Sequence, residues 1–288
     1  MMNPKAIKEM FGASQAPEIR FSLTDIPIKV REMVGKMSIS GVQPKATVTF
    51  VKSKSELVIA PAGGEFILKP QTQQFPHLPE NENCCMDIAE TLGIDVPRHC
   101  LLPLSDGTLA YVVKRFDRQG GEKIPMENFY QILEKKDKYS GSLEEIGKKL
   151  KEISAVPGYD VQLFFDQVAL NFLLGNGDAH FKNYSILTDD NKQIRLSPAY
   201  DIVSSKLVIP DDTDSALTLA GKKNKLARKD FDIFADSLKI PEKVRYEKFE
   251  GKFGMIKELI QKSELPAGYK TKFLEIVRFR YERLKIKE

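Results

Sequence analysis

Residues 176–183 read NGDAHFKN and hold an aspartate and an asparagine at a chemically useful spacing. In phosphoryl-transfer enzymes, an Asp followed by four residues and an Asn supplies a catalytic base and a metal ligand. Asp178 and Asn183 stand in this relation, and Asp201, in the segment PAYD, is a candidate second metal ligand. One carboxylate for an acceptor hydroxyl and two oxygen ligands for Mg²⁺ are enough to transfer a phosphoryl group. Because such pairs also arise by chance, the motif indicates a phosphoryl-transfer site only if the surrounding sequence predicts a suitable structure.

The sequence around this loop predicts the elements that hold it. Apolar residues recur with helical spacing over residues 161–174, and Gly and Asn at 175–177 should end that helix because they tolerate positive φ. Two short strands at 184–187 and 193–196, joined by a polar turn, then carry the chain to the second metal-ligand candidate. A buried helix, a loop, a hairpin and a metal-binding aspartate occur in this order in the large lobe of protein-kinase-like folds.

The N-terminal half alternates in the manner of β-strands. The pattern predicts strands at 46–51, 56–60, 65–70, 100–104 and 109–114. Lys69, near the end of the third strand, either binds the α- and β-phosphates of a nucleotide or points into solvent. A helix predicted at 83–92 has Glu82 at its start, where the acid either pairs with Lys69 or favours the positive helix N-terminus.

Two further segments of the N-terminal half are candidates for nucleotide binding. Residues 114–118 follow the last strand, where a hinge to a helical lobe is expected, and hinge backbone groups can bind an adenine edge without a particular side chain. Residues 38–45, SISGVQPK, have one glycine and do not match G-x-G-x-x-G. They either cover the phosphates with Ser hydroxyls, backbone N–H groups and Lys45, or form an ordinary Ser/Gly turn.

Composition indicates a soluble globular protein. The 288 residues allow one large domain or two lobes, and 42% hydrophobic and 29% charged residues are ordinary fractions. No run reaches the ~18 apolar residues of a membrane span, and the N-terminus lacks the apolar region of a signal peptide. Cys84, Cys85 and Cys100 show no metal-ligand spacing and are expected to be reduced thiols. We therefore predict a cytoplasmic protein without a membrane segment, and the net charge of +4 does not by itself indicate nucleic-acid binding.

Taken together, these segments resemble the HipA-like serine/threonine kinases, the toxins of bacterial toxin–antitoxin modules. The matching segments follow in order from roughly residue 35 to residue 225. They are SISGVQPK (38–45), FILKP (66–70), NEN (81–83), VVKRFDR (112–118), MENFYQIL (126–133), NGDAHFKN (176–183), LSPAYDIVSS (196–205) and LTLAGK (217–222). The pattern N-x-D-x-H-x-x-N followed by PAYD is the most specific of them.

The resemblance implies an α+β, two-lobed protein-kinase-like fold, with a β-rich N-terminal lobe over 1–115 and a mostly helical lobe over 116–288. It implies that Asp178 is the catalytic base, and that Asn183 and Asp201 bind Mg²⁺. The implied ATP-binding residues are Ser40, Gly41, Val42, Gln43, Pro44, Lys45, Lys69, Lys114, Arg115, Phe116, Asp117, His180, Lys182, Asn183, Tyr200 and Asp201. Two of these have a simpler interpretation, in which His180 only orients the loop and Lys182 is a surface charge.

The resemblance also implies partners and a switch. About 35 residues precede SISGVQPK, so the chain is most similar to the short HipT form, whose missing part is a separate small protein, HipS. A HipB-like DNA-binding antitoxin is the other expected partner, and DNA is contacted only through it. The implied substrate is an aminoacyl-tRNA synthetase, and the short form favours tryptophanyl-tRNA synthetase. In the family, autophosphorylation of a serine in the 38–45 loop inactivates the kinase, so Ser38 and Ser40 are candidate sites.

Two other function classes stay open at this stage. A small-molecule phosphotransferase with an aminoglycoside-kinase-like fold uses a similar aspartate loop. A non-catalytic ATP-binding subunit of a repressor complex would need only some of the residues Lys69, Asp178, Asn183 and Asp201.

The C-terminal residues 226–288 show three helix-like apolar faces. Their basic end, RFRYERLKIKE, is either a solvated helix face or a surface for an acidic partner or DNA.

Overall fold

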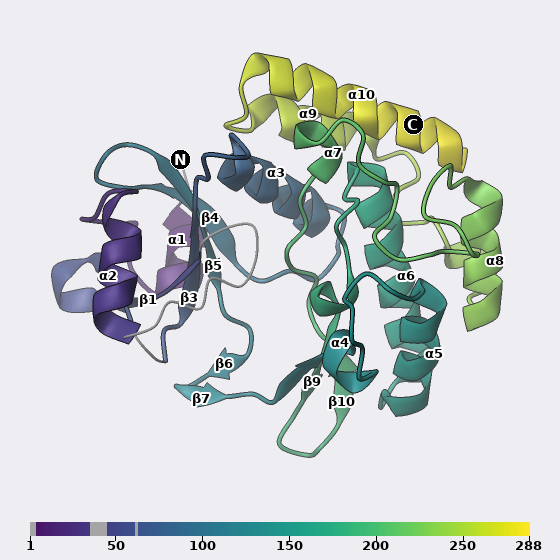
Figure 1. The fold of residues 1–288 in the computed structure, drawn as a ribbon, viewed down its shortest axis with the longest axis horizontal. Helices are drawn as coiled ribbons and strands as arrows, with labels where there is room; N and C mark the ends of the chain where they lie inside the picture. The colour runs from purple at the N-terminus through teal and green to yellow at the C-terminus, as the bar shows by residue number, and fades with distance from the viewer. Residues whose placement is uncertain (1–3, 35–44, 61–62) are drawn as a thin grey trace. The chain divides into compact units, whose positions relative to one another are not determined.

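The computed structural model describes residues 4–34, 45–60 and 63–288 (Figure 1). Contacts divide the chain into two compact units. The first, which we call the sheet unit, comprises Met1–Asn83 and Pro97–Lys123. The second, the helical unit, comprises Cys84–Val96 and Ile124–Glu288.

An antiparallel five-stranded sheet forms the centre of the sheet unit, with the strand order β2-β1-β3-β5-β4. All five predicted strands are present, with bounds that differ by at most one residue from those expected. The strands are β1 (Ala46–Val51), β2 (Glu56–Ile59), β3 (Phe66–Pro70), β4 (His99–Pro103), β5 (Leu109–Lys114) and the short pair β6 (Arg118–Gln119) and β7 (Glu122–Lys123).

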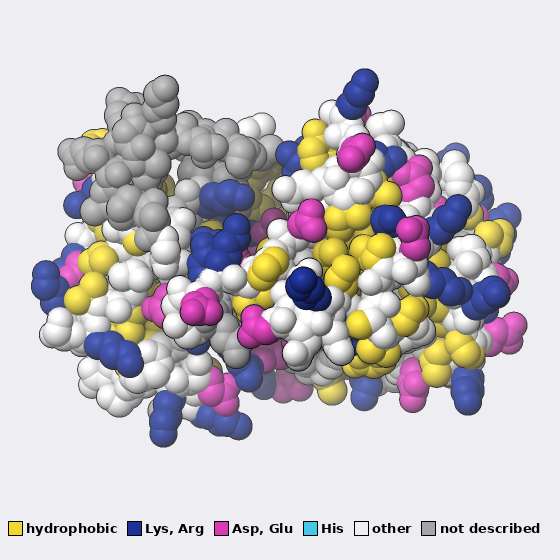
Figure 2. Space-filling model, turned by 90° about the horizontal axis from the view of Figure 1, so that it is seen from below, with side chains coloured by type: hydrophobic (Ala, Val, Ile, Leu, Met, Phe, Trp, Pro, Cys, Tyr) yellow, Lys and Arg dark blue, Asp and Glu magenta, His cyan; other side chains and the backbone are white. Residues whose placement is uncertain are grey.

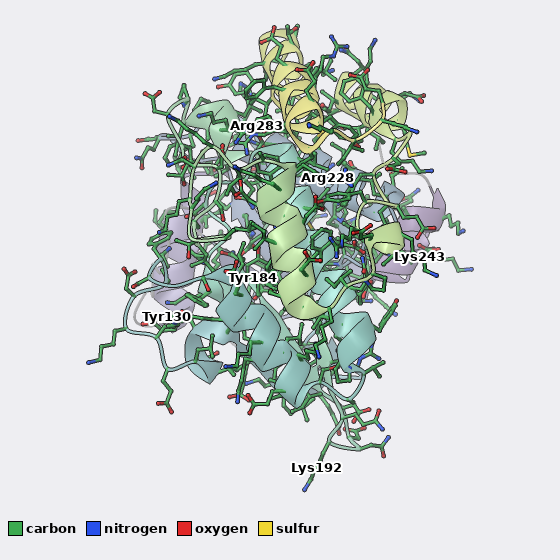
Figure 3. The ribbon with its side chains drawn as sticks, turned by 90° about the vertical axis from the view of Figure 1, so that its right-hand side faces the viewer. Tyr130, Tyr184, Lys192, Arg228, Lys243 and Arg283 are labelled. Carbon is green, nitrogen blue, oxygen red and sulfur yellow. The ribbon has the colours of Figure 1, made fainter. Side chains whose placement is uncertain are left out.

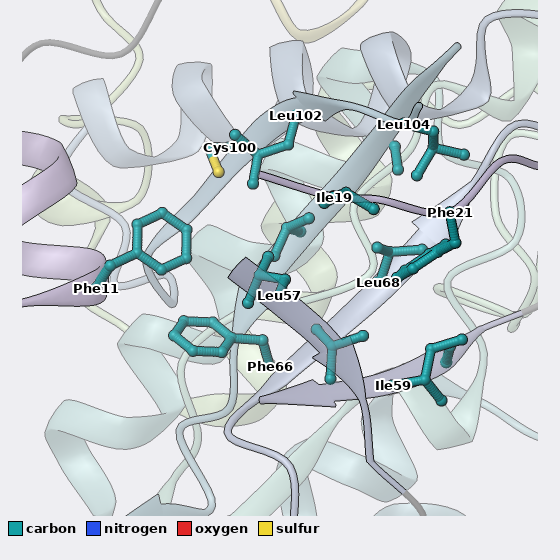
Figure 4. Close-up of a cluster of buried hydrophobic side chains, with 14 of the residues drawn as sticks. Phe11, Ile19, Phe21, Leu57, Ile59, Phe66, Leu68, Cys100, Leu102 and Leu104 are labelled. Carbon is teal, nitrogen blue, oxygen red and sulfur yellow. The ribbon is translucent and has the colours of Figure 1, made fainter. Parts of the chain in front are cut away.

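One face of this sheet is covered by two helices that the sequence pattern did not reveal, α1 (Pro4–Phe11) and α2 (Asp25–Val34). Figure 4 shows Phe11 next to Phe66 in the resulting core, and the two ring centroids are 5.1 Å apart. Leu68 is fully buried in the same cluster. Because side chains alternate along a strand, Lys69 is directed to the opposite face of β3.

The helix α3 (Leu78–Thr91) begins five residues earlier than the predicted start at residue 83. Pro79 lies in its first turn, where the missing N–H costs nothing, and Glu80 supplies the acid near the positive end. Asn81 and Asn83, which are weak helix formers, obscured this start in the sequence. Glu82 therefore lies in the second turn, so the helix-terminus interpretation applies to Glu80 instead.

Besides the C-terminal part of α3, the described residues of the helical unit form a three-stranded sheet of order β10-β9-β8 and seven α-helices. Its strands are β8 (Met126–Asn128), β9 (Ser185–Thr188) and β10 (Ile194–Leu196). Its helices are α4 (Phe129–Ile132), α5 (Leu143–Ile153), α6 (Pro157–Leu174), α7 (Ser205–Val208), α8 (Arg228–Leu238), α9 (Phe253–Lys262) and α10 (Ala267–Leu284). The predicted hairpin and the three predicted C-terminal helical faces are confirmed.

The helix α6 is the centre of this unit, and α5, α8, α10 and β10 pack around it (Figure 1). It starts four residues before the predicted position, because Pro157 occupies the first helical position, where proline is favoured. Phe164 and Phe165 are fully buried against Phe234 of α8. Each such side chain contributes roughly 1.5–3 kcal/mol by burial. As predicted, the helix ends at Gly175, which has φ 73°.

The basic end of the chain is not simply a solvated helix face. Arg280 is 2% exposed and its guanidinium lies 2.8 Å from Asp214, which Arg283 also contacts. Burial lowers the pKa of Arg280 to about 10, although Asp214 opposes this shift. Figure 3 labels Arg283 near one end of α8, together with Arg228, and shows Lys192 projecting at the tip of the β9–β10 hairpin. Part of the predicted basic surface therefore stabilises the interior.

Surface charges of both signs are interspersed on the face drawn in Figure 2. This distribution agrees with the small net charge of +4. Among the residues that the structure describes, no helix combines the length and apolar character that a membrane crossing requires.

Candidate active site

In the sheet unit, Lys69 and Glu82 form a buried ion pair. Lys69 Nζ lies 2.6 Å from Glu82 Oε1, and the two side chains are 11% and 2% exposed. Of the two interpretations of Glu82, the pairing with Lys69 is present, and the alternative of a strand-end lysine in solvent is wrong. Lys69 Nζ also lies 5.6 Å from the ring centroid of Tyr111 on the neighbouring strand β5. A lysine on the third strand that pairs with a glutamate of the following helix is the arrangement that protein kinases use for the nucleotide phosphates.

The segment expected to form the hinge is fixed within the sheet unit by its own contacts. The amides of Lys114 and Arg115 donate to the carbonyls of Arg98 and Glu65, each at 2.8 Å. Arg115 binds the carboxylate of Asp117 with two hydrogen bonds, of 2.8 and 2.6 Å. Burial opposes ionisation of Asp117, but the hydrogen bonds and charge of Arg115 outweigh it, so the pKa of Asp117 is lowered.

In the helical unit, the backbone of residues 176–183, which we call the NGD loop, is anchored at successive positions. The amide of Gly177 donates to Ser205 Oγ at 2.7 Å, and that of Asp178 donates to Asn176 Oδ1 at 3.1 Å. A Cβ on Gly177 would collide with Asp212 and the carbonyl of Thr213, so only glycine fits there. The loop is therefore rigid in its backbone while the Asp178 side chain is exposed to solvent.

Asn183 and Asp201 are brought together although they lie 18 positions apart. Asn183 Nδ2 is 3.4 Å from Asp201 Oδ2, and Asn183 Oδ1 accepts a hydrogen bond from the amide of His180 at 3.0 Å. Asp201 has φ 56°, in the left-handed region that non-glycine residues rarely adopt. Strained backbone of this kind is concentrated at functional sites.

These two side chains fit a magnesium ion that is completed by substrate phosphates and water. Mg²⁺ is usually held by one or two protein oxygen ligands and seldom by an all-protein cage. The described ranges contain no group of three or more His, Cys, Asp or Glu residues that could hold a metal ion. Asn183 and Asp201 would supply the amide and carboxylate oxygens.

Three other predicted nucleotide-binding residues have contacts within the helical unit. His180 is buried, with Nε2 2.8 Å from Lys138 Nζ, and burial together with the charge of Lys138 lowers its pKa, against the effect of Asp178. Tyr200 donates its hydroxyl to the carbonyl of Lys182 at 2.8 Å. The ammonium of Lys182 lies 4.5 Å from the ring centroid of Tyr130. These contacts hold the NGD loop, and the predicted nucleotide contacts of these residues stay predictions.

The loop predicted to cover the phosphates falls mostly outside the described residues. This applies to Ser38, Ser40, Gly41, Val42, Gln43 and Pro44. Lys45, its last residue, is exposed and directly precedes β1.

The sequence did not reveal the residues that support the NGD loop from other elements. Tyr139, which lies 39 positions before Asp178, donates its hydroxyl to Asp178 Oδ1 at 2.8 Å. Asp212 accepts a hydrogen bond from Ser205 Oγ, the group that holds Gly177. No spacing rule connects residues so far apart, so only the folded chain identifies them.

Comparison with known proteins gives a consistent family. The model of the family described as HipA-like C-terminal domain matches residues 37–261. A Sinorhizobium fredii protein named "Putative kinase Y4dM" is 33% identical over 219 residues, which cover 69% of this chain and 53% of that protein. The serine/threonine-protein kinase toxin HipA of Shewanella oneidensis is 23% identical over 67% of this chain and 48% of its own length. The chain thus spans about half the length of the curated relatives it matches.

Solved structures confirm the predicted protein-kinase-like α+β fold. HipA of Shewanella oneidensis, in a complex with HipB and operator DNA, superposes with a TM-score of 0.70 and 21% identity over 87% of this chain and 66% of that chain. The proinflammatory kinase CtkA of Helicobacter pylori gives a TM-score of 0.58 and 16% identity over 83% of this chain and 91% of its own.

Proposed function

Because the chain belongs to the HipA-like C-terminal domain family, we propose that it is an ATP-dependent serine/threonine protein kinase. The observation that carries this proposal is the convergence of Asn183 and Asp201, 3.4 Å apart, in the unit that presents Asp178 to solvent on an anchored loop. A pure nucleotide-binding module would need no exposed carboxylate next to a metal-ligand pair. The buried Lys69–Glu82 pair of the sheet unit supports the same conclusion.

In the proposed reaction, each residue has one role. Asp178 accepts the proton of the acceptor hydroxyl as the hydroxyl oxygen attacks the γ-phosphorus. Asn183 and Asp201 would hold Mg²⁺, and this ion would supply positive charge that neutralises the phosphates of ATP. Lys69, oriented by Glu82, binds phosphate oxygens, and residues 114–117 bind the adenosine part. Positioning and charge stabilisation then supply most of the rate.

The proposal is tested by incubating the purified chain with Mg²⁺ and ATP labelled on its γ-phosphate. We expect label on a protein acceptor such as dephosphorylated casein, and none on an aminoglycoside such as kanamycin. Transfer to the aminoglycoside alone would indicate a small-molecule phosphotransferase. ATP binding without any transfer or hydrolysis would indicate the non-catalytic subunit and would overturn the proposal.

We further propose that the kinase is the toxin of a toxin–antitoxin pair with a HipB-like antitoxin. The support is that the similar HipA structure is a complex with HipB and operator DNA. A HipS-like partner and an aminoacyl-tRNA synthetase substrate, with tryptophanyl-tRNA synthetase favoured, rest on the sequence resemblance. Expression of the chain alone should arrest bacterial growth, and overproduction of the substrate synthetase should relieve the arrest. Relief by none of the synthetases would exclude this substrate class.

Autophosphorylation at Ser38 or Ser40 is the proposed means of inactivation. A phosphate there adds roughly −1.5 to −2 charges beside the position proposed for the triphosphate, so like-charge repulsion should weaken ATP binding. Mass spectrometry should find phosphate on one or both serines in the active protein and on neither in Asp178→Asn. Unchanged ATP affinity after replacement of both serines by Asp would contradict the switch.

A further inference from the structure

Residues 137–141, between α4 and α5, lie directly against the NGD loop within the helical unit. The carbonyl of Lys138 accepts a hydrogen bond from the amide of Phe181 at 3.3 Å, and Lys138 Nζ contacts His180 Nε2 at 2.8 Å. A Cβ on Gly141 would collide with the ring of Phe181, so the backbone approaches the loop as closely as a glycine allows. The third contact is the hydroxyl of Tyr139 on Asp178.

Tyr139 is held by contacts of its backbone and of its ring. Its amide donates to Asp137 Oδ1 at 3.0 Å, and its carbonyl accepts from Lys223 Nζ at 2.9 Å. The Tyr139 ring meets the His180 ring edge-on, with ring centroids 5.2 Å apart. Lys138 Nζ lies 4.7 Å from the centroid of the Tyr139 ring. These contacts restrict the backbone and the ring of Tyr139, which is 37% exposed, and its hydroxyl is directed to Asp178.

The hydroxyl of Tyr139 acts as a hydrogen-bond donor towards Asp178. Burial raises the pKa of Tyr139, and the hydrogen bond to Asp178 raises it further, so the phenol keeps its proton. Its oxygen is 2.8 Å from Asp178 Oδ1. An ionised carboxylate accepts on both oxygens, so a hydrogen bond on Oδ1 restricts rotation of the group while Oδ2 can accept a second hydrogen bond.

We propose that Tyr139 is a positioning residue for phosphoryl transfer, which orients Asp178 through Oδ1 so that Oδ2 receives the proton of the acceptor hydroxyl. The inference rests on the proposed kinase function. In the step, the acceptor oxygen forms a bond to the γ-phosphorus, its proton passes to Oδ2, and the bond to the β–γ bridging oxygen breaks, so that ADP leaves with the electron pair. Tyr139 keeps its own proton throughout.

The test compares Tyr139→Phe, which keeps the ring and removes the hydroxyl, with Tyr159→Phe as the matched control. Tyr159 is 56% exposed at the start of α6, away from the NGD loop. With casein as acceptor and ATP hydrolysis as a second readout, kcat of Tyr139→Phe should fall about 10- to 100-fold, the range of a hydrogen bond to a charged group. The KM for ATP and the thermal midpoint should stay at their wild-type values, and Tyr159→Phe should match the wild type throughout.

A double-mutant cycle separates this role from a merely structural one. If Tyr139 acts through Asp178, then Tyr139→Phe should not lower the residual rate of Asp178→Asn any further. An equal loss of kcat from Tyr139→Phe in the wild-type and Asp178→Asn backgrounds would overturn the inference. A wild-type or increased kcat in Tyr139→Phe would also overturn it, because the hydroxyl would then not assist the transfer. Phosphate on Tyr139 itself, detected by mass spectrometry, would also overturn it, because the phenol would then be an acceptor.

The outcomes also distinguish the inference from the function on which it rests. If Asp178→Asn retains wild-type turnover, the proposed catalytic base is wrong and the inference falls with it. If Asp178→Asn is inactive while Tyr139→Phe is normal, only the positioning role is wrong.

Discussion

The helix α6 and the NGD loop are neighbours in sequence, and both carry acidic residues. Their carboxylates differ in burial and in hydrogen-bond partners. On α6, Asp160 is fully buried and accepts hydrogen bonds from Arg195, Ser154 and the amide of Leu196, at 2.7 to 3.1 Å. Beyond the helix end, Asp178 is exposed. Its backbone is held by the protein, whereas its carboxylate has a single described partner, Tyr139.

The difference shows which carboxylate contributes to the stability of the fold and which one is accessible to a ligand. The carboxylate of Asp160 is satisfied by protein donors, so it stabilises the fold and has no capacity for a substrate. In the NGD loop the amides of Gly177 and Asp178 make stabilising hydrogen bonds, and the side chain of Asp178 is exposed to solvent, where it can meet an acceptor hydroxyl. Burial and partners therefore separate structural acids from chemical ones, where residue type alone does not.

The largest expected effect is the loss of phosphoryl transfer when Asp201, a proposed metal ligand, is replaced. Asp201→Asn should lower phosphoryl transfer by ~10³-fold or more, because the carboxylate proposed to hold Mg²⁺ is lost. Asparagine tolerates the left-handed backbone of Asp201, so the fold should be retained. Fluorescent-nucleotide titrations with and without Mg²⁺ should show that the Mg²⁺ enhancement of ATP binding disappears. Asp190→Asn, on the exposed hairpin turn, is the control, and an unaltered Mg²⁺ dependence in Asp201→Asn would break the assignment.

A second acid on α6, Asp166, should make stability depend on pH. Burial raises the pKa of Asp166 from 3.8 to about 7, with Lys248 and Gln162 opposing the shift. The folded protein therefore keeps a proton that the unfolded chain releases between about pH 4 and 7, so stability falls as pH rises through this window. The loss should amount to at most about 4 kcal/mol.

Urea denaturation at pH 5 and pH 8 measures this effect. Asp166→Asn, which is neutral at both values, should remove this contribution to the pH dependence and be more stable than the wild type at pH 8. An identical pH dependence in both proteins would show that Asp166 is ionised in the fold like an exposed acid.

Asp160→Asn should affect stability and leave chemistry intact. Loss of the charge-assisted bonds with Arg195 should lower the free energy of unfolding by about 2–3 kcal/mol. Transfer per folded molecule should match the wild type, since Asp160 is buried on the helix and away from solvent. A kinetic defect that exceeds the loss of folded protein would remove the distinction between the two regions.

The smallest expected effect concerns the sheet unit, where the buried Lys69–Glu82 pair has a proposed role in binding phosphate. Glu82→Gln keeps the shape but not the charge that orients Lys69, so kcat/KM for ATP should fall roughly 10-fold. Glu90→Gln, an exposed position on the same helix, serves as the matched control. If Glu82→Gln lowers only stability, the pair belongs with the structural acids.

The parts of the site that are local in sequence could be predicted, and those that depend on distant packing could not. The helix end at Gly175 and the β9–β10 hairpin follow from patterns within short segments, whereas the sequence left the pairing of Lys69 with Glu82 as one of two interpretations. The support from Tyr139 depends on how the segment before α5 packs on the loop, which no local pattern encodes.

Two errors in the fold prediction have local causes. The start of α3 was placed too late because Pro79 and the asparagines near it are poor helix formers in isolation, although a proline is tolerated in the first turn. The helices α1 and α2 have only 8 and 10 residues, too few for a clear periodic signal, and they owe their stability to burial on the sheet. The motif NGDAHFKN singled out Asp178 in the sequence, but no sequence feature showed that Asp160 is fully buried, because burial is a property of the fold.

The central claim, that the exposed acid of the NGD loop does chemistry and the buried acid of α6 does not, is tested most directly by one crossed measurement. Phosphate transfer from ATP per folded molecule is compared for Asp178→Asn and Asp160→Asn, alongside their urea midpoints. We predict that Asp178→Asn loses ~10³-fold or more in transfer at a wild-type midpoint, and that Asp160→Asn shows the reverse. Near-normal transfer by folded Asp178→Asn would contradict the account.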